Sequence, residues 1–159
     1  MTDLKVGKLL QDKLIEQFKL LTHPASASLL FSSVEKIYMS EPTQLPSCEV
    51  QIQTVNNTTS DNYTNNKIFV FDAIVYDLIE SASNTQAEAD SRVDRISNIN
   101  DSLTNWLSYI PLPIEYSITD LHCWKVDEIS SNFDRLQNSQ GVMLYLSIKF
   151  SVYTTNEIR

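Results

Sequence analysis

The chain has 159 residues, 42% of them hydrophobic and 20% charged, and it carries a formal net charge of −8. This length and composition predict one domain, residues 1–159, that is large enough to bury a full core. The acidic balance argues against a surface that grips nucleic acid, which needs clustered Lys and Arg. The lack of both an apolar run of about 18 residues and a signal-peptide pattern argues against a membrane protein.

The first part of the chain predicts one amphipathic helix followed by three strands. Over residues 3–22, apolar side chains recur every three or four positions, as on a helix with one buried face, and Pro24 ends the pattern. Residues 34–39 predict a short strand, and residues 48–55 alternate as a half-buried strand does. Residues 67–78 are apolar on both faces, so we expect a central strand that is covered on both sides.

A polar segment separates the last two of these strands. Residues 56–66 contain no apolar residue except Tyr63. They predict an exposed hairpin loop that is longer than a tight turn. Asn62 and Tyr63 are candidates for a subunit interface, whereas the single carboxylate of Asp61 is too little for a calcium loop.

A long second helix follows. Thr85 and Glu88 have the spacing of a capping box, which marks a helix start. An apolar stripe then continues to Ile110, and Pro111 and Pro113 end it.

The C-terminal part predicts two more strands. Residues 117–126 predict the first strand, and the polar residues 127–140 predict a loop or a short helix. Gly141 turns the chain into a strand over residues 142–154. In it an unbroken apolar series, every second residue from Val142 to Val152, alternates with a mixed series from Met143 to Tyr153. Residues 154–159 predict a polar C-terminal tail.

Together these elements predict an α+β fold. Because the strand–strand links are direct or hairpin-like, we expect a mostly antiparallel sheet of about four to five strands. Two amphipathic helices would pack on one face of it. The other face carries Gln51, Met143, Tyr145, Lys149 and Tyr153, which is the half-polar mixture expected of a face that is exposed or covered by a partner.

The sequence predicts no catalytic, cofactor or metal site, and therefore no enzyme. With Gly7 and Gly141 as the two glycines, neither a P-loop nor a dinucleotide fingerprint fits. Cys48 and Cys123 are expected to be free buried thiols. Adjacent residues of a strand point to opposite faces, so His122 and Cys123 cannot form a nucleophilic dyad. The His and Cys spacings match no metal-binding pattern.

Asp90, Asp94 and Asp101 lie along the second predicted helix. Paired carboxylates can act as general acid and base, but on the flank of a helix they are far more often a solvated face. The alternative is an acidic surface that faces a partner or a polyanion.

The order of elements resembles the tail terminator (tail completion) proteins of tailed bacteriophages. The resemblance is one of architecture and covers most of the chain. The matching pieces are the helix 4–21, the Pro-containing segment Glu41–Pro46 before the strand 48–55, the polar hairpin before the strand 68–78, the helix 85–110 and the last strand 142–154.

This resemblance implies a structural virion protein of the tail and neck, assembled in the host cytoplasm. Subunits of that family form a hexameric ring that caps the tail tube and stops its polymerisation. The implied partners are other copies of the chain, the tail tube protein, the head–tail connector or neck protein, and tape-measure protein or double-stranded DNA in the lumen. Asn62, Tyr63, Asp90, Asp94 and Asp101 are the residues expected at the subunit interface or the lumen.

Two alternatives stay open. One is another subunit of the same machine, such as a neck, head–tail joining or tube-like protein. The other is a small ligand-binding or enzymatic α+β domain with a pocket built from Tyr116, Asp120 and His122. A thermal-shift screen with metals and nucleotides distinguishes the second alternative, because a bound ligand stabilises the fold.

Overall fold

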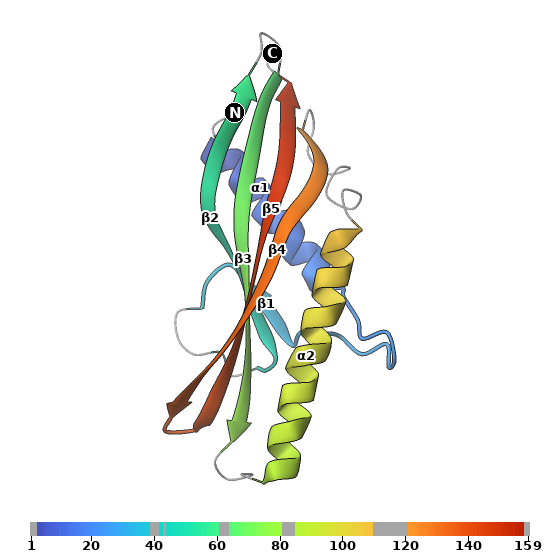
Figure 1. The fold of residues 1–159 in the computed structure, drawn as a ribbon, viewed down its shortest axis with the longest axis vertical. Coiled ribbons are helices and arrows are strands. Elements are labelled where there is room, and N and C mark those ends of the chain that lie inside the picture. The colour runs from blue at the N-terminus through green and yellow to red at the C-terminus, as the bar shows by residue number, and fades with distance from the viewer. Residues whose placement is uncertain are drawn as a thin grey trace.

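The computed structural model describes residues 3–38, 42, 44–60, 64–80, 85–109 and 121–157. The helices are α1 (Asp3–Phe18) and α2 (Gln86–Ser108), and the strands are β1 (Ser33–Glu35), β2 (Ser47–Ser60), β3 (Thr64–Glu80), β4 (Leu121–Asn138) and β5 (Gly141–Glu157). This is the predicted order of elements (Figure 1). None of the described helices is long and apolar enough to cross a bilayer.

The strands form one sheet in the order β1-β2-β3-β5-β4. The short β1 runs parallel to β2, and every other neighbouring pair is antiparallel. The predicted α+β class with a mostly antiparallel sheet is therefore confirmed.

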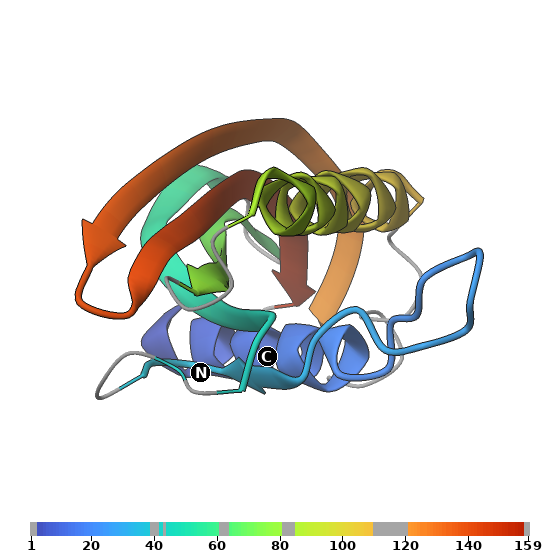
Figure 2. The ribbon, with the colours of Figure 1, turned by 90° about the horizontal axis from the view of Figure 1, so that it is seen from below.

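Both helices pack on one face of the sheet, as predicted. Figure 2 looks along the strands and shows the strongly curved sheet with both helices on its inner side. One cluster of buried side chains joins the layers, with Leu10, Leu14 and Phe18 from α1, Ile96, Ile99, Leu103 and Leu107 from α2, and Phe69, Phe71, Leu146 and Phe150 from the sheet. The apolar stripes read from the sequence are the faces that the helices bury.

The central strand β3 is covered fully on its helix face and only partly on the other. Phe69, Phe71, Ala73 and Val75 are buried beneath the helices. The alternate side chains, from Ile68 to Leu78, remain partly exposed except for the buried Asp72. Among the residues described, no second layer of secondary structure covers that face, so the prediction of a strand covered on both sides is wrong for it.

Three segments that the sequence predicts as loops or tail are strands. β2 continues to Ser60 and β3 begins at Thr64, which leaves residues 61–63 of the predicted loop 56–66. β4 runs through most of the polar segment 127–140, and β5 continues through Glu157 into the predicted tail. These segments lack an apolar alternation, yet their backbones pair with β3 or β5 outside the irregularities between Asn57 and Ser60 and between Asp127 and Ser130.

The predicted ends of α1 and α2 are confirmed only in part. Thr85 is the N-cap of α2, and its hydroxyl oxygen accepts a hydrogen bond from the Glu88 backbone N–H at 3.2 Å. The Glu88 carboxylate pairs with Arg92 at 2.8 Å. α1 ends earlier than predicted because residues 21–30 fold back on themselves, with the Leu30 N–H donating to the Leu21 carbonyl at 2.9 Å.

Candidate interaction surfaces

One end of the sheet projects beyond the helices. β3 and β5 each have 17 residues and span roughly 56 Å at about 3.3 Å per residue, whereas the 23 residues of α2 span about 35 Å. The excess forms an extension made of residues 56–60, 64–67 and 154–157, called the polar arm below (Figure 1). Its residues are Asn, Thr, Ser, Lys and Glu without an apolar member. At its base it meets the core, because Thr154 and its β4 partner Cys123 are both buried.

The polar arm is held by cross-strand contacts. The Thr155 hydroxyl donates to the Asn66 side-chain oxygen at 2.8 Å, and the Thr154 hydroxyl donates to the Lys67 carbonyl at 3.3 Å. Thr–Asn pairs of this kind stabilise adjacent strands without burying apolar area. The arm is thus an ordered, hydrophilic projection, and the predicted interface residues Asn62 and Tyr63, which follow β2 in the chain, lie outside the described residues.

Asp90, Asp94 and Asp101 come together on one exposed line of α2. At about 100° per residue, their spacing places them within about 40° of one another around the helix axis. All three side chains are exposed, and Asp90 accepts a hydrogen bond from Gln86 Nε2 at 2.9 Å. We call these three residues the acidic stripe. The three carboxylates thus lie on an exposed acidic face of α2.

The acidic stripe borders two grooves between α2 and the segment that follows α1. One groove, of about 500 Å³, is lined by Asp90, Asp94 and His23 among others. The second, of about 530 Å³, is lined by Asp101 and Pro24 among others. Nowhere in the described part of the chain do three or more His, Cys, Asp or Glu side chains gather as metal ligands.

A polar network on β4 and β5 escaped the sequence prediction. β4 bulges between Asp127 and Ser130, and Glu128 adopts the left-handed conformation with φ 55°. Its carboxylate accepts hydrogen bonds from the hydroxyls of Tyr153 at 2.6 Å and Ser151 at 3.0 Å. These bonds lower the pKa of Glu128, and the bond to Glu128 raises the pKa of Tyr153. These hydrogen bonds hold the bulge in place. The sequence could not reveal the network, because the strand register is needed to bring Glu128 beside Ser151 and Tyr153.

The sheet face away from the helices carries a tyrosine cluster. Tyr76 lies between Tyr38 and Tyr145, with ring centroids 6.1 and 5.3 Å away in edge-to-face geometry. The Tyr38 backbone N–H donates to the buried Glu49 carboxylate at 3.1 Å, which ties the segment after β1 to this face. Burial raises the pKa of Tyr76 to about 12.

This shift predicts a loss of stability at alkaline pH. The pKa of Tyr76 is raised from 10.0, so between about pH 10 and about pH 12 the unfolded chain has lost a proton that the folded chain keeps. The free energy of unfolding should therefore fall as pH rises through this window. Tyr76→Phe should make the decline shallower in urea titrations across pH 9–12, whereas Tyr109→Phe, at an exposed ring, should leave it unchanged.

The two cysteines are free and buried, as predicted. Burial raises the pKa of the Cys48 thiol, which opposes formation of the reactive thiolate. His122 is part of β4, but its side chain lies outside the described residues, as do Tyr116 and Asp120. The pocket that these three residues would form in the ligand-binding alternative therefore stays a prediction.

The surfaces that the structure offers for function are accordingly the polar arm and the acidic stripe, together with the groove between α2 and β4 described below. In comparisons with known proteins, no family model and no curated protein matches this chain.

Proposed function

We propose that this protein is a ring-forming structural subunit of the phage tail terminator type, which caps a tail tube and joins it to the head connector. The observation that carries the proposal is the polar arm. A head-to-tail ring needs two different surfaces on each subunit, and an ordered projection beyond the core gives a subunit the means to reach its neighbour. The arm lies in the part of the chain that resembles the polar hairpin of that family.

The acidic stripe supports the second part of the proposal, a lumen through which DNA passes. A protein that neutralises many phosphates binds DNA tightly and in a salt-dependent way. A wall of carboxylates leaves the phosphates unbound, so it would not retard a moving DNA molecule. The three carboxylates of the stripe lie on one line of an exposed helix face, which is the form that a lumen wall requires.

Light scattering of the purified protein, followed by negative-stain imaging, tests the proposal directly. We expect particles of about six times the 18.2 kDa subunit mass, seen as rings with an open centre. To detect a ring that assembles only in the presence of the tail tube, the protein is mixed with short tube segments and the tube length is measured. A protein that stays monomeric by itself and leaves tube length unchanged in the mixture would falsify the ring proposal.

Shortening the polar arm should abolish the ring and leave the subunit folded. Residues 58–66 are removed and Asn57 is joined to Lys67, its partner across the β2–β3 ladder, through an Asn-Gly turn. Light scattering should then report monomers, while the thermal unfolding midpoint stays close to that of the parent because no core residue is lost. Rings of unchanged mass from this variant would show that the arm is not the subunit contact.

Reversing the acidic stripe should create DNA binding. Asp90→Lys, Asp94→Lys and Asp101→Lys together change the net charge from −8 to −2 and place three cations on one helix line. We expect binding to double-stranded DNA at low salt that weakens as salt rises, and reduced DNA ejection from virions that carry the variant.

A matched variant separates position from net charge. Glu35, Glu80 and Asp134 are exposed and lie on three different strands, so their change to Lys gives the same net charge without a line of cations. This control should bind DNA much more weakly. Equal DNA binding by both variants, or normal infectivity with the reversed stripe, would contradict a lumen role for the stripe.

A further inference from the structure

A cleft of about 530 Å³ lies between α2 and the last two strands. Ile96 of α2 and Leu144 of β5 are the buried part of its lining. Val93 and Phe133 also line it, yet 48% and 51% of their surfaces remain exposed. Large apolar side chains that border a cleft while half exposed are typical of a binding groove that its own chain does not fill.

The strand beside this cleft has an open edge. β4 is the last strand of the sheet and pairs with β5 alone. From Ser130 to Gln137 its register with β5 is regular, and its residues from Ser131 to Gln137 are exposed. No backbone group of the described residues pairs with the outer side of this run. Such an edge presents backbone N–H and C=O groups to another chain. Within this run the Arg135 backbone N–H donates to the Asp134 side-chain oxygen at 2.8 Å.

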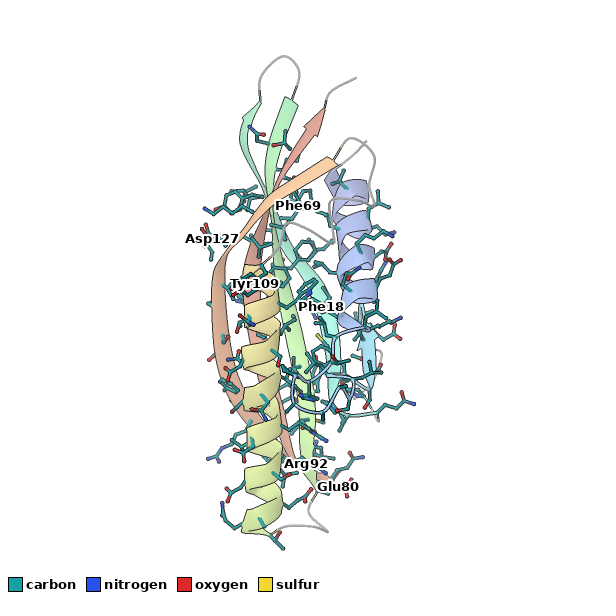
Figure 3. The ribbon with its side chains drawn as sticks, turned by 90° about the vertical axis from the view of Figure 1, so that its right-hand side faces the viewer. Phe18, Phe69, Glu80, Arg92, Tyr109 and Asp127 are labelled. Carbon is teal, nitrogen blue, oxygen red and sulfur yellow. The ribbon has the colours of Figure 1, made fainter. Side chains whose placement is uncertain are left out.

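The open edge and the cleft belong to one groove. Phe133 and Arg135 stand opposite Leu146 and Leu144 of β5, so their side chains lie on the helix face of the sheet, beside α2. Figure 3 shows α2 alongside β4, and the Ser131 hydroxyl donates to the Asn100 side-chain oxygen at 2.7 Å, which ties the strand to the helix. A chain added to β4 would send every second side chain toward the cleft.

Arg135 is the cation of this groove, whose lining also includes the carboxylate of Asp134. It lines the cleft together with Phe133, and none of the ion pairs among the described residues involves it. Its guanidinium is suited to hold a carboxylate through two parallel hydrogen bonds. Because Phe133 and Arg135 are two positions apart on the strand, the residues opposite them on an added chain are also two positions apart.

We propose that the groove between α2 and β4 binds an extended segment of another protein by strand addition. The backbone of that segment pairs with Ser130–Gln137, an apolar side chain enters the cleft against Val93 and Phe133, and an acidic side chain two positions away pairs with Arg135. This binding site is separate from the polar arm and the acidic stripe, and it stands whether or not the chain forms a ring.

The probe is an acetylated and amidated octapeptide of threonines with one leucine and one glutamate two positions apart, in both orders. We expect saturable binding by NMR titration and slower hydrogen exchange of the outward-facing amides between residue 131 and residue 137. These are every second amide, because the others already face β5. Arg135→Glu should weaken binding about tenfold or more, and a peptide with lysine in place of the glutamate should restore it. Lys149→Glu, the same charge change on the opposite face of the sheet, should leave the affinity unchanged.

Two further changes, one in the protein and one in the peptide, test the cleft and the strand addition separately. Ser97→Trp, which fills the cleft, should abolish binding. Methylation of the peptide amides that pair with β4 should abolish it as well. The proposal fails if neither peptide binds the folded protein, or if affinity does not depend on the charge at Arg135. It also fails if the protein alone self-associates with protection of the same amides, because the occupant is then a second copy of this chain.

Discussion

Phe18→Ala is expected to lower the free energy of unfolding by about 3–5 kcal/mol. Phe18 is fully buried at the end of α1, where Figure 3 shows it between the two helices. Its ring meets Trp106 of α2 edge-to-face, with 5.6 Å between centroids, and lies 6.4 Å from the ring of Phe31. Truncation removes these contacts and leaves a cavity that the helices, both held by the sheet, cannot close.

Urea denaturation of the parent and the variant measures this loss, with equal slopes as the check that both unfold in the same way. Phe133→Ala is the matched control because it removes the same atoms from a half-exposed ring, and it should cost less than about 1 kcal/mol. Similar losses at the two positions would mean that Phe18 is not the packing link between α1 and α2.

The two helices and the buried half of the sheet could be predicted because each has one fully buried face. Leu10, Leu14 and Phe18 repeat with the period of a helix, and residues 142–152 repeat with the period of a strand. Burial imposes that periodicity. The arm strands and the part of β4 after Asp127 lack an apolar alternation, so their sequences read as loops although their backbones pair with neighbouring strands outside two irregularities.

The same limit explains which candidate surfaces could be foreseen. The acidic stripe follows from the spacing of Asp90, Asp94 and Asp101 on a helix that the sequence already predicts. The groove beside β4 could not be foreseen, because Phe133 and Arg135 fall in the segment 127–140 that reads as a loop. Only the register with β5 places their side chains toward α2.

The second large effect concerns a buried ion pair that links β3 to α2. The Asp77 side chain is 1% exposed, and Arg95 donates to both of its carboxylate oxygens, from Nε to Oδ2 at 2.7 Å. Arg95→Met should therefore lower the free energy of unfolding by about 3–5 kcal/mol, because it leaves a buried carboxylate without its cation. For a chain of this length, the melting temperature should fall by roughly 6–20 °C.

The expected loss of stability in Arg95→Met arises from the unpaired Asp77 carboxylate rather than from the lost attraction between the two charges. A double variant distinguishes these two causes. Asp77→Leu combined with Arg95→Met removes both charges and should regain most of the lost stability, as apolar replacement of a buried pair often does. Lys13→Met, which breaks the exposed pair between Lys13 and Glu16, should change the free energy of unfolding by less than about 1 kcal/mol. If the double variant is as unstable as Arg95→Met, the pair is a net source of stability, and α2 is held on the sheet by charge as well as by its apolar stripe.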